Sequence, residues 1–217
     1  MKKRALLVVA FLATSAVAQS AQPQGFGICK PIAQRTRDVG CWIASDDPIG
    51  PAPAAIVYWH VDEFASRADA ERNKTSRSSV MEAFGKVWLL TIDRQDWRPA
   101  HGGKHAASVG PLHVTAGRNY STLLMQNVLD VGMTSAIHLH SGPEAWYTIA
   151  GETCLETPDG KHVERAGASS LSVEAHKPML LTATGKTQRR ALALILHPTD
   201  EPPTTMVHNW KPKGLCK

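Results

Sequence analysis

The chain has 217 residues, of which 43% are hydrophobic and 20% charged, as is ordinary for one or two globular domains. This composition excludes disordered, collagen-like and low-complexity proteins. The formal net charge is +5, but three of the 24 basic residues stand at positions 2–4; without them the excess over the 19 acidic residues is +2. So small an excess gives no indication of nucleic-acid binding.

Residues 1–18 have the pattern of a secretory signal peptide. Lys2, Lys3 and Arg4 precede an apolar run over 5–13, and Ala16-Val17-Ala18 has the small-residue spacing of a cleavage site. The apolar stretch is shorter than the roughly 20 residues of a transmembrane helix. We therefore expect cleavage after position 18, a periplasmic or secreted protein, and no membrane association once the signal is removed.

Residues 19–110 are predicted to form an N-terminal α+β extension. The stretch up to about residue 55 is rich in Pro and Gly and is expected to be irregular, with one short strand near 41–43. Strands are expected over 55–61 and 86–92, and a helix over 63–73 with Asp62 as its N-cap. The unit contains no recognisable chemical motif, and its tryptophans are expected to form its core.

The four cysteines all follow the predicted signal peptide, in a chain expected to reach an oxidising compartment. Two disulfides with three connectivities are then conceivable. Pairing Cys29 with Cys41 would close a short loop, and pairing Cys154 with Cys216 would attach the C-terminal tail to the last domain. We take this pairing as a working hypothesis.

From residue 111 to 198 the sequence changes to short β-rich runs separated by turn signals. Pro158-Asp159-Gly160 and Gly185-Lys186 mark two of the turns. Many short strands at close spacing predict an antiparallel sandwich or small barrel. Residues 199–217 contain several prolines and are expected to form an irregular tail. The strands are expected over 121–130, 134–140, 144–150, 152–157, 161–165, 170–174, 179–184 and 190–196.

One group of residues in this region is suited to bind a metal. In a strand His138 and His140 point to the same face, and after a tight turn at 141–143 Glu144 opens the returning strand. Two imidazoles and a carboxylate on adjacent strands form a ligand set for Fe, Mn, Ni, Zn or Cu and leave open coordination positions. The alternative is a polar group that is held together by hydrogen bonds alone.

Together with Gly132 and Gly151, these three residues match every fixed position of the first motif of the cupin superfamily, and the sequence resembles that superfamily over about 115–198. The resemblance implies a mostly β fold, a cupin-like antiparallel β-barrel of the jelly-roll type with the metal site in its interior. It also implies that His138, His140 and Glu144 are the first three metal ligands.

The second cupin motif departs from the pattern. Met179 stands where the resemblance places a fourth ligand histidine, and His176 stands where it places a glycine. A thioether is a soft ligand, so Met179 binds weakly, favours copper, or simply fills the core. His176 is expected at the rim, as a lesser candidate for a ligand or proton-transfer group. Of Trp146 and Tyr147, one is expected to line the pocket.

The leading hypothesis is an exported, metal-dependent enzyme of oxygenase or isomerase/lyase type that acts on a small molecule. The alternative is a non-catalytic periplasmic protein that binds a small ligand or a metal. A third reading makes the barrel purely structural, with the N-terminal unit and tail forming a partner interface. A homodimer is also plausible, because cupin barrels often pair through sheet edges.

Overall fold

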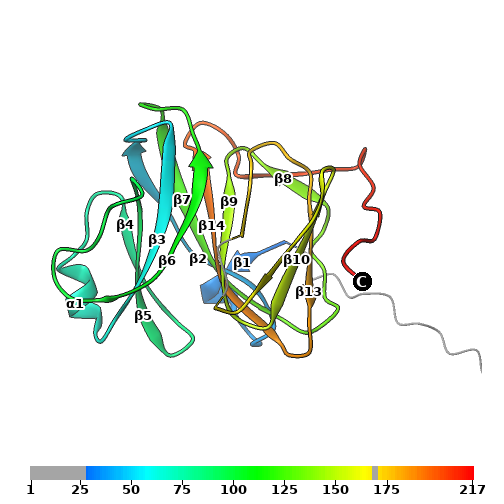
Figure 1. Ribbon diagram of the computed structural model, residues 1–217, viewed down its shortest axis with the longest axis horizontal. Helices are drawn as coiled ribbons and strands as arrows, with labels where there is room; N and C mark the ends of the chain where they lie inside the picture. Colours follow the sequence, from blue (N-terminus) through cyan, green and yellow to red (C-terminus); the bar gives the residue numbers. More distant parts are fainter. Residues whose placement is uncertain (1–27, 168–170) are drawn as a thin grey trace, which may run out of the picture.

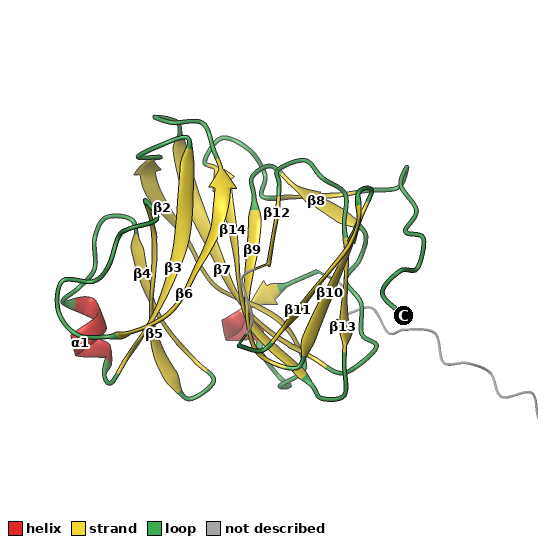
Figure 2. Ribbon diagram, viewed as in Figure 1, coloured by secondary structure: helices red, strands yellow, loops and turns green. Residues whose placement is uncertain are grey.

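The computed structural model describes residues 28–167 and 171–217, and their regular secondary structure is almost all β-strand, joined by turns and loops (Figures 1 and 2). The predicted signal peptide lies outside the described residues. A central sheet has the strand order β1-β2-β7-β14-β9-β12 and is antiparallel except for the β1–β2 pair. Its strands are β1 (Lys30–Pro31), β2 (Gly40–Pro51), β7 (Asn119–Leu129), β14 (Arg189–Pro198), β9 (Glu144–Ala150) and β12 (Leu171–Val173).

Three smaller sheets accompany the central one. The first has the order β4-β5-β3-β6, the second β11-β10-β13, and the third pairs β15 with β8. Short helices lie outside these sheets: α1 (Arg67–Glu71) and a 3-10 turn (Ile32–Gln34). The strands are β3 (Ile56–Phe64), β4 (Ser78–Ala83), β5 (Lys86–Asp93), β6 (Lys104–His113), β8 (His138–His140), β10 (Glu152–Thr157), β11 (Gly160–Arg165), β13 (Leu180–Thr184) and β15 (Thr204–Met206).

The central sheet is covered on both faces, so the molecule has three layers (Figure 2). In β14, Leu192, Leu194 and Leu196 pack with the β4-β5-β3-β6 sheet, whereas Ala193 and Ile195 pack with residues of the β11-β10-β13 sheet. Successive strand residues point to opposite faces. This double burial explains why β14 reads as a continuous apolar run rather than an alternating one.

The mostly β, antiparallel part of the predicted fold class is confirmed. The described strands form facing sheets and do not close into one continuous barrel. The metal-site half of the molecule lies between the central sheet, β8 and the β11-β10-β13 sheet (Figure 1).

The N-terminal extension differs from the α+β unit that the sequence predicted. The expected helix over 63–73 is reduced to α1, because β3 continues through Asp62 to Phe64. Ser66, not Asp62, caps α1, accepting a hydrogen bond from the backbone N–H of Asp69 at 3.2 Å. The unit is therefore an antiparallel sheet that carries one helical turn.

The stretch expected to be irregular before residue 55 contains the long strand β2. This strand pairs with β7 of the central sheet and shifts register between Ile43 and Ser45 and between Pro48 and Gly50. Such bulges accommodate proline and glycine within a strand. β2 thus joins the central sheet although it lies within 19–110, and β6 crosses the expected boundary at residue 110.

Two disulfides attach the chain ends to the sheets. Cys29 pairs with Cys41, at the start of β2, and Cys154 of β10 pairs with Cys216, which confirms the pairing taken as the working hypothesis. The tail is also held by Glu156, whose carboxylate accepts hydrogen bonds from the backbone N–H groups of residues 213–215. Among the described residues, no helix has the length and apolar character needed to cross a membrane.

Candidate metal centre

The turn between β8 and β9 places the carboxylate beside the two histidines. It approaches the backbone of β14 so closely that a Cβ atom on Gly142 would lie 1.8 Å from the carbonyl oxygen of Leu196. The carbonyl of Pro143 accepts a hydrogen bond from the N–H of Leu196 at 3.0 Å. Only glycine fits at position 142, and the turn is thereby fixed with Glu144 at the first position of β9.

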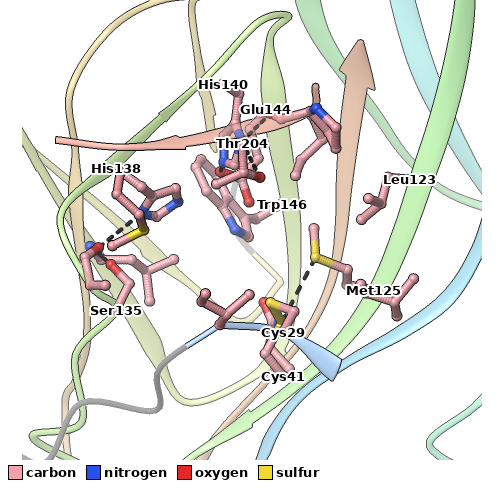
Figure 3. A pocket seen from close by; sticks show the side chains of 18 residues that line it. Cys29, Cys41, Leu123, Met125, Ser135, His138, His140, Glu144, Trp146 and Thr204 are labelled. Carbon is pink, nitrogen blue, oxygen red and sulfur yellow. Dashed lines mark hydrogen bonds and ion pairs between the residues drawn. A yellow bond between two sulfur atoms is a disulfide. The ribbon is translucent and has the colours of Figure 1, made fainter. Parts of the chain in front are cut away.

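The structure brings His138, His140 and Glu144 together (Figure 3). One ligand atom from each of the three lies within 4.8 Å of the others. The Nε2 atom of His140 is 2.8 Å from Oε2 of Glu144. His140 and Glu144 are buried and His138 is half-buried, so the cluster is largely shielded from bulk solvent.

Backbone carbonyls fix the orientation of both imidazoles. Nδ1 of His138 is 2.8 Å from the carbonyl oxygen of Ala136, and Nδ1 of His140 is 2.8 Å from that of Pro203. A carbonyl oxygen only accepts hydrogen bonds, so in each ring Nδ1–H is the donor, and Nε2 is the nitrogen that offers a lone pair when the imidazole is neutral. This is the arrangement in which a metal-binding histidine is held by its second nitrogen.

The two histidines differ in how their surroundings affect protonation. Burial lowers the pKa of His138 below its usual value. Burial also opposes the charged form of His140, but the adjacent Glu144 carboxylate outweighs it, and the pKa of His140 is raised. Without an ion, the imidazole of His140 is therefore protonated more readily than that of His138.

The residues present fit a divalent metal ion. Nε2 of His140 and Oε2 of Glu144 are fully buried, and the 2.8 Å contact between them is the one polar contact that either atom makes among the described residues. Buried polar atoms with so few partners are costly and call for an explanation such as an ion. Two imidazole nitrogens and one carboxylate oxygen are ligands that first-row transition metals accept.

The cluster stands at one end of a pocket of about 260 Å³. Apolar side chains make most of its wall, and the Cys29–Cys41 disulfide lies at the far end from the histidines (Figure 3). Apart from the metal cluster, its polar side chains are Asn127, Ser135 and Thr204. Its apolar wall is formed by Ile28, Ile43, Leu123, Met125, Trp146, Leu181, Ile195 and Met206 among others.

The remaining predicted site residues fall in different places. Trp146 lines the pocket, whereas Tyr147 points to the opposite face of β9 and packs edge-on against Trp88. His176 is exposed, in a turn where its backbone is left-handed (φ 59°). Neither His176 nor Met179 belongs to the described pocket lining. Met179 is fully buried in the core on the pocket side of the central sheet.

Sequence reasoning missed the part of the site that the C-terminal tail provides. β15 pairs with β8, and Pro203, Thr204 and Met206 all line the pocket. The prolines before residue 204 predicted an irregular tail and concealed a three-residue strand. The pair of β-branched threonines, Thr204 and Thr205, was the one local signal for it.

Two other histidines, His60 and His105, belong to a polar network in the β4-β5-β3-β6 sheet. Asp62 lies 2.9 Å from Nδ1 of His105, whose Nε2 lies 3.0 Å from Oγ of Ser108. The same hydroxyl lies 3.0 Å from Nδ1 of His60, and His60 Nε2–H donates to the carbonyl of Arg94 at 2.8 Å. Burial raises the pKa of Asp62 and lowers that of His60. The network joins β3, β6 and the loop after β5.

No family model matches the chain, and no curated protein matches it. The solved structures similar to it include cupin-type proteins, the class to which the motif points. A cupin-like protein from Thermotoga maritima is 10% identical, with a TM-score of 0.36 over 42% of this chain and 77% of that one. The polyketide cyclase RemF from Streptomyces resistomycificus is 17% identical, with a TM-score of 0.34 over 42% and 63%.

The chain spans only part of some of these proteins. The capsular polysaccharide assembling protein CapF from Staphylococcus aureus is 10% identical, with a TM-score of 0.34. The similarity covers 45% of this chain but only 34% of CapF. It likewise covers less than two thirds of RemF.

Proposed function

We propose that this protein is a metal-dependent enzyme that acts on a small, largely apolar molecule. One observation carries the proposal: two imidazole Nε2 lone pairs and a carboxylate converge at the end of an apolar pocket. The pocket leaves room beside the cluster for a substrate, which a purely structural metal site would not require.

His138, His140 and Glu144 would hold the ion, and the carbonyls of Ala136 and Pro203 would keep both imidazoles in the ligating tautomer. When bound, the ion supplies Lewis-acid chemistry or a binding position for dioxygen. Outside the cluster the described lining contains no carboxylate, histidine or lysine to serve as a general base. An isomerase or lyase needs such a base, so the lining favours the oxygenase type over that class.

The size and lining of the pocket restrict the substrate. A pocket of about 260 Å³ is in the range of small-molecule sites and has no room for a polymer. The described lining includes no Lys or Arg, so a second anionic group on the substrate would be buried without a partner, which is costly. An apolar body with one oxygen donor directed at the ion fits these limits.

Metal content measured by mass spectrometry on untagged protein tests the proposal. We expect near-stoichiometric transition metal in the wild type and none in the His138→Ala/His140→Ala variant. Oxygen consumption by the metal-loaded protein with small apolar carboxylates, phenols and diketones then tests turnover. A wild type that contains no metal and takes up none on reconstitution would refute the proposal.

A second candidate function is a non-catalytic protein that binds a small ligand or a metal. The absence of a general base in the described lining and the methionine at position 179 favour it. The two functions differ in turnover: a bound metal that consumes neither oxygen nor any tested substrate would favour binding.

We further propose that the protein works in the periplasm or is secreted. Two disulfides support this, because they persist in oxidising compartments. Fractionation of cells that express the full chain, with a cytoplasmic and a periplasmic marker followed in parallel, tests it.

A further inference from the structure

Strand β15 places a second row of side chains beside the two histidines. In its antiparallel pairing with β8, Met206 lies opposite His138 and Thr204 lies opposite His140. Directly opposed side chains point to the same face, with their Cβ atoms about 4.5–5.5 Å apart. Met206 and Thr204 line the same pocket as the histidines. The thioether of Met206 therefore shares the pocket face of the cluster.

The register of β15 is fixed by contacts to the candidate ligands themselves. The Pro203 carbonyl and the Thr204 hydroxyl lie 2.8 and 3.1 Å from Nδ1 of His140. After the strand, the N–H of Val207 donates to the carbonyl of Ile137 at 3.1 Å. Met206 stands between these two attachments and cannot slide along β8 without breaking them.

Met206 does not behave as a core residue. It is 40% exposed and so lies outside the buried core. Met179 also lies opposite His138, and the two residues exchange backbone hydrogen bonds of 2.9 and 3.3 Å. Unlike Met206, Met179 has no exposed surface. Packing explains Met179, whereas nothing in the core requires a methionine at 206.

We infer that Met206 supplies a thioether ligand to the ion held by His138, His140 and Glu144, and that it shifts the preference of the site toward copper. The inference rests on the proposed function, since it requires the cluster to hold a metal. A thioether is a soft donor that selects Cu(I) over harder ions. Methionine has three rotatable side-chain bonds, so its sulfur can turn toward the ion from this position.

The test compares Met206→Leu with Met179→Leu in the oxidised protein. Leucine keeps the apolar volume and removes the sulfur. Cu(I) affinity is measured anaerobically by competition with bicinchoninate, and Zn(II) affinity by competition with a chromogenic chelator. For Met206→Leu we expect Cu(I) affinity to fall on the order of tenfold, which is about 1.4 kcal/mol, with Zn(II) affinity within about twofold. Met179→Leu should change neither.

X-ray absorption on the Cu(I)-loaded proteins provides the structural measurement. A sulfur neighbour of copper that is present in the wild type and in Met179→Leu, but missing in Met206→Leu, would support the inference. If Met179→Leu removes the sulfur instead, or if neither variant changes it, the inference is overturned while the proposed function stands. A wild type that binds no metal through its histidines overturns both.

Discussion

The candidate ligands depend on groups that do not touch the ion, and each histidine is held by a main-chain carbonyl. Glu144 differs, because its position comes from the turn before it and its Oε2 atom contacts the imidazole of His140 rather than a main-chain group. Its negative charge also raises the pKa of His140. Glu144 is therefore the residue whose loss changes the metal site most directly.

Replacing Glu144 by alanine should release the metal while the chain stays folded. We expect metal affinity to fall at least roughly 100-fold, because a ligand contributes more than the supporting contacts, which are each worth about 10–100-fold. Metal content and a chelator competition assay measure this. Glu174→Ala, at an exposed carboxylate, is the matched control. Full occupancy in Glu144→Ala would show that Glu144 is not a ligand.

A second buried carboxylate, Glu164, belongs to a chain of hydrogen bonds. Arg189 Nε–H donates to Thr153 at 2.5 Å, the Thr153 and Thr148 hydroxyls lie 3.0 Å apart, and Thr148 donates to Glu164 at 2.5 Å. Burial is the main cause that raises the pKa of Glu164 to about 7, and burial lowers that of Arg189 to about 10. The hydroxyls link two charges that are expensive to bury.

The raised pKa of Glu164 predicts how stability depends on pH. Between pH 4.5 and about 7 the folded chain keeps a proton that the unfolded chain has lost. Raising the pH through this window should therefore lower the free energy of unfolding by a total on the order of 3 kcal/mol. Above about pH 7 this group should cause no further decrease.

Thermal unfolding of metal-free protein at several pH values measures this, with Glu164→Gln as the test variant. Glutamine has the shape of glutamic acid and no proton to lose, so the decline across the window should become flatter. Glu174→Gln controls for removing an exposed carboxylate. Equal slopes in the wild type and in Glu164→Gln would contradict the prediction.

At the scale of elements, the β8–turn–β9 unit determines the site. Gly142 lets the turn touch β14, and at the far end of β9 Gly151 combines a left-handed backbone (φ 72°) with a Cβ position only 2.7 Å from Cα of Arg189. Two close approaches to one neighbouring strand thus fix both ends of β9.

Gly142→Ala should destabilise the protein on the order of 3 kcal/mol, because the added methyl group meets backbone that cannot move aside. For a chain of this length the midpoint of thermal unfolding should fall by roughly 10 °C. Ser141→Ala in the same turn is the control, and it should change the midpoint little. A Gly142→Ala protein as stable as the control would show that the turn relaxes freely.

These elements also show where the sequence was informative. The His-x-His spacing, the turn and Glu144 predicted the ligand cluster because a strand's two-residue period and a tight turn are local properties. β2 and β15 were not predicted, since Pro48, Gly50 and Pro203 suppress strand signals that are restored by pairing with β7 and β8. The helix expected from Asp62 was overridden by the pairing of β3 with β5 and β6. Long-range pairing decided all three.

At the scale of the whole molecule, two disulfides attach chain ends to different layers. Cys154–Cys216 spans 62 residues and Cys29–Cys41 spans 12, so the first constrains the unfolded chain more. The tail that it anchors contains β15, which supports His140. Stability and metal binding are therefore coupled through this disulfide.

The Cys154→Ser/Cys216→Ser double variant should lose about 2–5 kcal/mol of unfolding free energy. Backbone hydrogen exchange at residues 204–207 should increase, and metal affinity should fall, because the Pro203 carbonyl no longer holds His140 firmly. Cys29→Ser/Cys41→Ser should lose less stability. Unchanged exchange in the tail of the first variant would show that β15 is held by its pairing with β8 alone.

The pocket wall comes from both extremes of the described chain, with Ile28 and Cys29 at one end and Pro203 to Met206 at the other. A chain still being synthesised, or one cut before residue 203, would lack a complete coordination environment. Under the proposed function, the full metal affinity is therefore expected only after the tail has docked. Tightly bound metal would then distinguish finished molecules from partly folded ones.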